Sequence, residues 1–212
     1  LEASLKREQT NNIEENEIPT FETKEGIDFV FEQNPELEQI GTKEQYSNYL
    51  DTIFPESKVN NIVYHGTTNN EFINFKETNI KFLEKLGIKI NKGTFFSDKL
   101  DHAKYFSNPE TSWKSKEGRV ISVLINLKKP LDPLFDYSFF PSSKNDGILS
   151  ENINDVGFKI TQYAVFHPSQ IHILGSKQDI EEFKEFVNNN TQNIKFNLSE
   201  KSKELSNLPN NQ

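Results

Sequence analysis

The chain contains no cysteine and no methionine among its 212 residues. Without cysteine there are no disulfide bridges, zinc–thiolate centres or iron–sulfur clusters, and no cysteine nucleophile. No apolar run approaches the roughly 20 residues that cross a bilayer, so we expect no membrane partner. The missing methionine and the start at Leu1 indicate a piece of a longer or processed chain.

Hydrophobic residues are also scarce, at 33% of the chain, against roughly 45–50% in a typical globular composition that includes glycine. Eighteen phenylalanines compensate, because each ring buries a large apolar area. The formal net charge of −8 disfavours a basic surface for nucleic acid. The composition is therefore that of an acidic protein with an aromatic core.

The ends of the chain differ from its middle. Residues 1–20 are polar and acidic without periodicity, which is typical of a disordered segment or linker. The asparagine run at 188–190 begins a second polar stretch, so we expect a tail or linker over residues 188–212. One domain is predicted between them, over residues 21–187.

Local signals predict most of the helices. Asn34 and Pro35 favour a helix start, and Thr42 with Gln45 has the spacing of a capping box. The helix after Thr42 should end at Pro55 and bury one stripe of side chains, namely Tyr46, Tyr49, Leu50, Ile53 and Phe54. Three more helices are expected over residues 80–86, 98–106 with Asp98 as cap, and 179–187.

Short apolar runs predict the strands, and the regions between them are interpreted as loops. The expected strands are residues 62–64, 94–96, 120–127, 147–149, 163–166 and 171–174. The loops include residues 132–146, a length often associated with function, and Ser150–Ile160, which carries Asp155.

Three segments hold residues that could bind a ligand. His65 ends a strand and precedes Gly66, where a ligand can approach the backbone closely. Phe95 and an aromatic of the next helix, Tyr105 or Phe106, could enclose a flat heteroaromatic ring, although core packing is the simpler interpretation. Gln162 lies at the start of an apolar strand. The other histidines, His102, His167 and His172, show no metal-ligand spacing and are interpreted as structural.

In this order, the three segments resemble the ADP-ribosyltransferase family, in the branch of diphtheria-like toxins and poly(ADP-ribose) polymerases. Its three motifs correspond to Tyr64-His65-Gly66-Thr67, to Gly93–Asp98 with the Ala103–Phe106 helix, and to Gln162–Phe166. The likeness is greatest to the modules of polyvalent phage and mobile-element proteins, with which the chain shares Asp146-Gly147-Ile148 and Pro168–Ile171. It covers about residues 45–187.

The resemblance implies an α+β fold, with a split mixed or antiparallel sheet and flanking helices, and a site for NAD as substrate without a metal. His65 would bind the adenosine ribose and Gly66 the nicotinamide amide, while Phe95 and Tyr105, or Phe106, would flank the ring. Gln162 and His65 are the implied catalytic residues. The implied NAD-binding residues are His65, Gly66, Thr67, Phe95, Ser97, Ala103, Tyr105 and Phe106.

Two departures from the family pattern bear on activity. Phe95 replaces the usual tyrosine, and Gln162 replaces the usual glutamate, so the site loses a carboxylate that favours positive charge on the sugar. The leading hypothesis is mono-ADP-ribosylation of a macromolecular acceptor, protein in preference to nucleic acid, in the cytoplasm of the cell or of a host. A catalytically weak NAD-binding module and an NAD glycohydrolase remain alternatives. By analogy, the Ser150–Ile160 loop would recognise the acceptor.

Overall fold

The structure is a computed structural model that describes residues 25–69, 74–75, 93–111, 118–131 and 145–206, with side chains up to residue 192. The predicted segment 1–20, the helix 80–86 and nearly all of the loop 132–146 lie outside the described residues.

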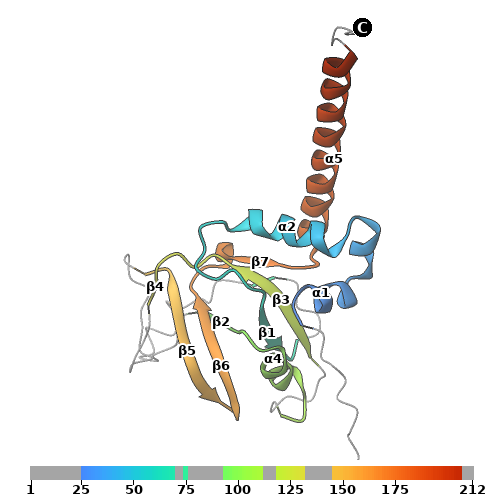
Figure 1. Ribbon diagram of the computed structural model, residues 1–212. Helices are drawn as coiled ribbons and strands as arrows, with labels where there is room; N and C mark the ends of the chain where they lie inside the picture. The colour runs from blue at the N-terminus through green and yellow to red at the C-terminus, as the bar shows by residue number, and fades with distance from the viewer. Residues whose placement is uncertain (1–24, 70–73, 76–92, 112–117, 132–144, 207–212) are drawn as a thin grey trace, which may run out of the picture.

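Within these described ranges, seven strands form one mixed sheet in the order β4-β5-β6-β2-β1-β3-β7 (Figure 1). All neighbouring pairs are antiparallel except β4 and β5. The sheet is open, with β4 and β7 at its edges, and the predicted α+β class is confirmed. The strands are β1 (Val63–Thr67), β2 (Thr94–Ser97), β3 (Arg119–Ile125), β4 (Pro130–Leu131), β5 (Gly147–Asp155), β6 (Phe158–Val165) and β7 (Ile171–Ile173).

The helices pack around this sheet. They are α1 (Ile27–Gln33), α2 (Lys43–Ile53), α4 (Leu100–Ser107) and α5 (Lys177–Ser206), with 3₁₀ turns at Pro35–Gln39 and Pro168–Gln170. Helix α2 crosses near β7 and the base of α5, whereas α4 lies beside β1 (Figure 1). None of the helices in the described ranges is long and apolar enough to span a membrane.

The start of α2 follows its sequence signals. The Thr42 side chain accepts a hydrogen bond from the Gln45 backbone, and the Gln45 side chain accepts one from the Thr42 backbone, which confirms the capping box. The predicted stripe also packs as expected: Tyr46, Tyr49 and Leu50 are buried, and Ile53 and Phe54 pack against the same core cluster.

Asp98 does not cap helix α4, contrary to the prediction. The helix begins at Leu100 after Lys99, whose backbone N–H donates to Ser97 Oγ. The Asp98 carboxylate instead accepts a hydrogen bond from the Thr161 backbone N–H at 2.8 Å, and the Asp98 N–H donates to the Thr161 carbonyl. The Asp98 side chain thus joins the end of β2 to Thr161 of β6, which is 63 residues away in the sequence.

The predicted loop at Ser150–Ile160 is wrong, because these residues form the β5–β6 hairpin. Asp155 pairs directly with Phe158, so the turn consists of Val156 and Gly157, with φ of 42° and 91°. Positive φ at both central residues matches the twist of paired strands. Its usual signal is Asn-Gly or Asp-Gly, which the sequence lacks at these two positions.

Helix α5 is longer than predicted and is anchored by a buried carboxylate. It begins at Lys177 and continues through the asparagine run to Ser206, so residues 188–190 are helical. Asp179 is fully buried and accepts hydrogen bonds from Tyr46 Oη at 2.6 Å and from the Gly175 N–H at 2.8 Å. His172 Nε2 lies 2.8 Å from its other oxygen. These bonds tie α5 to α2 and β7.

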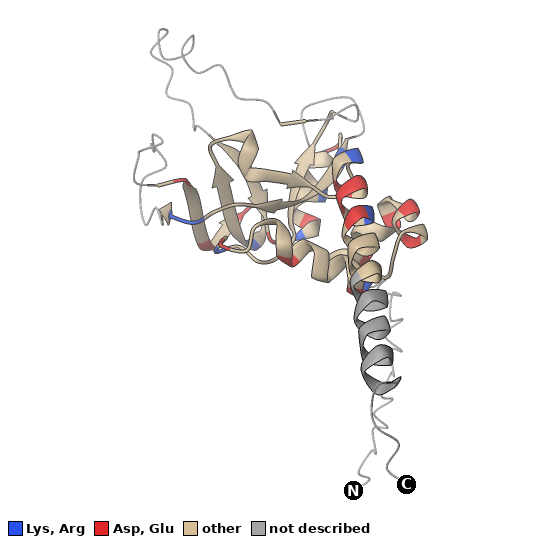
Figure 2. Ribbon diagram, turned by 90° about the horizontal axis from the view of Figure 1, so that it is seen from above, with Lys and Arg blue, Asp and Glu red and all other residues tan. Residues whose placement is uncertain are grey.

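Many of the charged residues lie on the helices (Figure 2). Strands β1, β2 and β7 carry no lysine, arginine, aspartate or glutamate. The polar side chains on these uncharged strands, such as that of His65, therefore gain importance.

Candidate functional site

A cavity of about 380 Å³ lies beside α4 and is called here the α4 cavity. Strands β1, β2, β6 and the end of β5 supply its other walls. Its lining residues are Tyr64, His65, Gly66, Phe95, Phe96, Ser97, His102, Ala103, Phe106, Asp155 and Gln162. It thus brings together residues of the three sequence-distant segments that carry the resemblance, in a volume usual for small-molecule sites.

The junction of β1 and β2 lies at this cavity. The two strands share one register pair, Tyr64 with Ser97, whereas β1 pairs with β3 over five residues and β2 with β6 over four. Where β1 and β2 leave each other, the ring of His65 bridges them: Nδ1 donates a hydrogen bond to the Phe95 carbonyl at 2.9 Å. The divergence of β1 and β2, bridged by this hydrogen bond, therefore positions His65 and Phe95.

The state of His65 follows from this environment. A carbonyl can only accept, so Nδ1 carries a hydrogen and Nε2 is the acceptor nitrogen of the neutral ring. Burial lowers the pKa of His65, and the bond to the Phe95 carbonyl offsets this only in part. Its ring contacts those of Phe75 and Phe96. His65 is therefore a neutral hydrogen-bonding group at pH 7.

The packing of helix α4 against β1 requires glycine at position 66. A Cβ at this position would lie 1.9 Å from the carbonyl oxygen of Ala103 and 3.0 Å from Phe106 Cβ. Helix α4 therefore approaches β1 closely only because residue 66 has no side chain. Ala103 is buried in this contact and lines the cavity.

We expect Gly66→Ala to destabilise the protein by about 1–3 kcal/mol, because α4 must move away from β1. Urea denaturation measures this loss. Gly93→Ala is the matched control, since its nearest contact would be 3.2 Å from the Val165 carbonyl oxygen and a small shift relieves it. Equal stability of Gly66→Ala and the parent protein would contradict the close packing.

Gln162 lies in a row of polar side chains that crosses the sheet. It pairs with Ser97 on β2 and with Ser150 on β5, and directly opposed residues project from the same face. The Ser150 hydroxyl is buried and has no hydrogen-bond partner among the described residues. Two hydroxyl groups thus flank the carboxamide of Gln162.

The remaining predicted residues divide between the cavity and its surroundings. Phe106 lines the cavity and is 39% exposed, whereas Tyr105 is not among the lining residues and its ring contacts those of Phe106 and Phe158. Thr67 also lies outside the lining, and its hydroxyl accepts from the Asn69 backbone. Of the two aromatic candidates on α4, Phe106 therefore faces the cavity with Phe95.

Two further residues line the cavity. His102 was interpreted as structural from the sequence, and Asp155 was placed in the segment expected to recognise the acceptor. His102 Nε2 lies 3.1 Å from Asp155 Oδ2. They are 53 residues apart, so no local spacing indicates their contact. The one sequence feature that pointed to Asp155 was its place in the polar segment before Val156 and Gly157.

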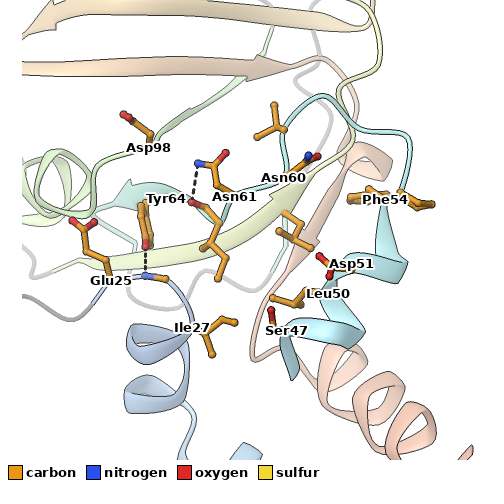
Figure 3. Close-up of a pocket in the computed structure, with 15 residues that line it drawn as sticks. Glu25, Ile27, Ser47, Leu50, Asp51, Phe54, Asn60, Asn61, Tyr64 and Asp98 are labelled. Carbon is orange, nitrogen blue, oxygen red and sulfur yellow. Dashed lines mark hydrogen bonds between the residues drawn. The ribbon is translucent and has the colours of Figure 1, made fainter. Parts of the chain in front are cut away.

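A larger cavity of about 710 Å³ lies between the sheet, α1 and α2 (Figure 3). Tyr64 points into it and its hydroxyl accepts a hydrogen bond from the Gly26 N–H at 2.6 Å. Glu25, Asp51 and Asp98 also line it, but of the residues singled out by the three motifs it contains only Tyr64 and Asp98. The smaller α4 cavity is therefore the better candidate site.

No cluster of three or more histidine, aspartate or glutamate side chains able to hold a metal occurs in the described part of the chain. A family model for ADP-ribosyltransferases in polyvalent proteins matches residues 60–143. This range includes the His65 and Phe95 motifs and ends before Gln162. No curated protein and no solved structure was found to match the chain.

Proposed function

We propose that this protein is an ADP-ribosyltransferase of the type found in polyvalent proteins, which the family match over residues 60–143 supports, and that it transfers ADP-ribose from NAD to a macromolecular acceptor. Nicotinamide is released in the reaction. The observation that supports this proposal best is the presence of His65, Phe95 and Gln162 around one cavity.

The lining of the α4 cavity fits NAD chemically. Phe95 and Phe106 offer aromatic faces for the nicotinamide ring. His65, neutral and with Nε2 as acceptor, can receive a hydrogen bond from a ribose hydroxyl. Gln162 can bind a hydroxyl of the other ribose. These groups hold NAD in a fixed orientation, which is the main contribution that such a site makes to the reaction.

The acceptor that we propose is a protein in preference to a nucleic acid. The net charge of −8 repels a phosphate backbone. The carboxamide of Gln162 favours a second candidate function, a module that binds NAD with little turnover, because an amide does not stabilise a developing positive charge as a carboxylate does. Hydrolysis of NAD, with water as acceptor, is the third.

One assay separates the three functions. The purified protein is incubated with NAD labelled in the adenylate part and with a cell lysate, and both nicotinamide release and label fixed to macromolecules are measured. Fixed label supports transfer, and nicotinamide release without fixed label supports hydrolysis. If neither occurs while calorimetry detects NAD binding, the protein is a binding module. Protease and nuclease treatment of fixed label identifies the acceptor class.

We expect His65→Ala to weaken NAD binding about 3- to 10-fold, the worth of one neutral hydrogen bond. Isothermal titration calorimetry measures the dissociation constant. His167→Ala is the control, because His167 is exposed and lies outside the α4 cavity. Unchanged affinity in a folded His65→Ala protein would remove His65 from the NAD site.

A further inference from the structure

Asp155 is the only acidic or basic residue other than histidine that lines the α4 cavity in the described structure. Of the other polar groups there, His65 is neutral, and Gln162 and Ser97 carry no charge. The cavity therefore lacks a carboxylate at the third motif but has one on the β5–β6 hairpin. Nothing in the family match, which ends at residue 143, assigns a role to this residue.

The Asp155 carboxylate is held in place by a buried histidine. The side chain of His102 is 6% exposed and that of Asp155 is 35% exposed, and Nε2 lies 3.1 Å from Oδ2. The His102 ring contacts those of Phe106 and Phe158, at centroid distances of 5.0 and 5.7 Å. A ring fixed in this way donates Nε2–H to the carboxylate and leaves Asp155 accessible.

We infer that Asp155 accepts the proton of the attacking acceptor group, with His102 as its positioning residue, and that the acceptor is a hydroxyl or an N–H group and not a carboxylate. This inference rests on the proposed transfer reaction. A proton acceptor is useful only to a nucleophile that must lose a proton, whereas a carboxylate acceptor attacks without losing one. The negative charge of Asp155 also repels a carboxylate acceptor.

The reaction balances without any further reactant. The bond between the ribose carbon and the nicotinamide nitrogen breaks, and its electron pair neutralises the charge of the pyridinium ring as nicotinamide leaves. A lone pair of the acceptor oxygen or nitrogen forms the new bond to the same carbon. The O–H or N–H bond of the acceptor breaks, and its proton passes to the Asp155 carboxylate and then to water.

The surroundings of Asp155 suit a macromolecular acceptor. Val156, the next residue, is 46% exposed, and Phe106, whose ring contacts His102, is 39% exposed. These are the exposed large hydrophobic residues of the described chain. An acceptor that covers both side chains would bring its nucleophile next to Asp155 and exclude water from the site.

The test measures label transfer and nicotinamide release in the same assay. Asp155→Asn is expected to lower the ratio of transfer to release about 100-fold, the typical effect of a positioned base. Glu151→Gln is the matched control, since it removes one exposed carboxylate from the same strand, outside the cavity, and should leave the ratio unchanged. His102→Gln, which keeps an N–H donor, should retain more of the ratio than His102→Phe.

The chemistry of the product provides a second readout. Label on a hydroxyl oxygen or on a nitrogen should outlast an ester to a carboxylate in neutral hydroxylamine, because hydroxylamine attacks the ester carbonyl fastest. An unchanged ratio in a folded Asp155→Asn protein, or label that hydroxylamine removes as fast as it removes a reference carboxylate ester, would overturn the inference while leaving transfer established. A parent protein that neither fixes label nor releases nicotinamide would overturn the proposed function, and the inference with it.

Discussion

Replacing Gln162 with glutamate should raise the rate of nicotinamide release about 100-fold. In the proposed reaction, positive charge develops on the ribose as nicotinamide leaves, and a carboxylate at position 162 would stabilise it where the amide cannot. One such fixed electrostatic partner is worth about 3–4 kcal/mol. The rate is measured as nicotinamide released at saturating NAD, so that a change in affinity does not contribute.

Two variants control this experiment. Asn154→Glu adds the same carboxylate to the neighbouring strand at an exposed position outside the cavity, and should leave the rate unchanged. Gln162→Ala removes the hydrogen-bonding group and should lower the rate.

In Gln162→Glu the introduced carboxylate would share the cavity with Asp155, so like-charge repulsion should favour the protonated form of the introduced group. The gain in the rate of nicotinamide release should therefore be larger at pH 8 than at pH 6. A folded Gln162→Glu protein without faster release would remove residue 162 from the reacting centre.

Asp179→Ala should lower the free energy of unfolding by about 3–5 kcal/mol. Asp179 is fully buried and accepts hydrogen bonds from Tyr46, His172 and the Gly175 N–H. Its removal leaves these buried donors without an acceptor, and breaking a buried charged network by deleting one partner costs this much. Chemical denaturation measures the loss.

The control for Asp179→Ala is Glu181→Ala, an exposed carboxylate of the same helix. It should change stability by less than about 0.5 kcal/mol.

The Asp179 contacts also predict how the stability of the protein depends on pH. Burial, and then the charge of Asp179, raise the pKa of Tyr46, so the folded state favours the neutral phenol. Stability should therefore be retained below about pH 10, the ordinary pKa of tyrosine, and should fall as the pH rises above it. Equal unfolding free energies for Asp179→Ala and Glu181→Ala would show that the Asp179 contacts do not anchor α5.

Elements with local signals could be predicted from the sequence. The capping box at Thr42, the stripe of α2 and the core of β3 each depend on residues close together along the chain. The β5–β6 hairpin was not predicted because it lacks such a local signal: its turn at Val156 and Gly157 does not contain the usual turn residues. The cap predicted at Asp98 failed because a backbone donor 63 residues away binds the carboxylate.

The sequence by itself determined the segments that bear the three motifs, and with them the family resemblance, because motif spacing and the alternation of apolar residues are local properties. Only the tertiary structure decided that Phe106 faces the α4 cavity while Tyr105 does not, and that His102 meets Asp155. The close contact of α4 with β1 depends on Gly66, and the position of Asp155 depends on the register of β5 on β6. Both depend on packing between residues far apart in the chain, which no local pattern specifies.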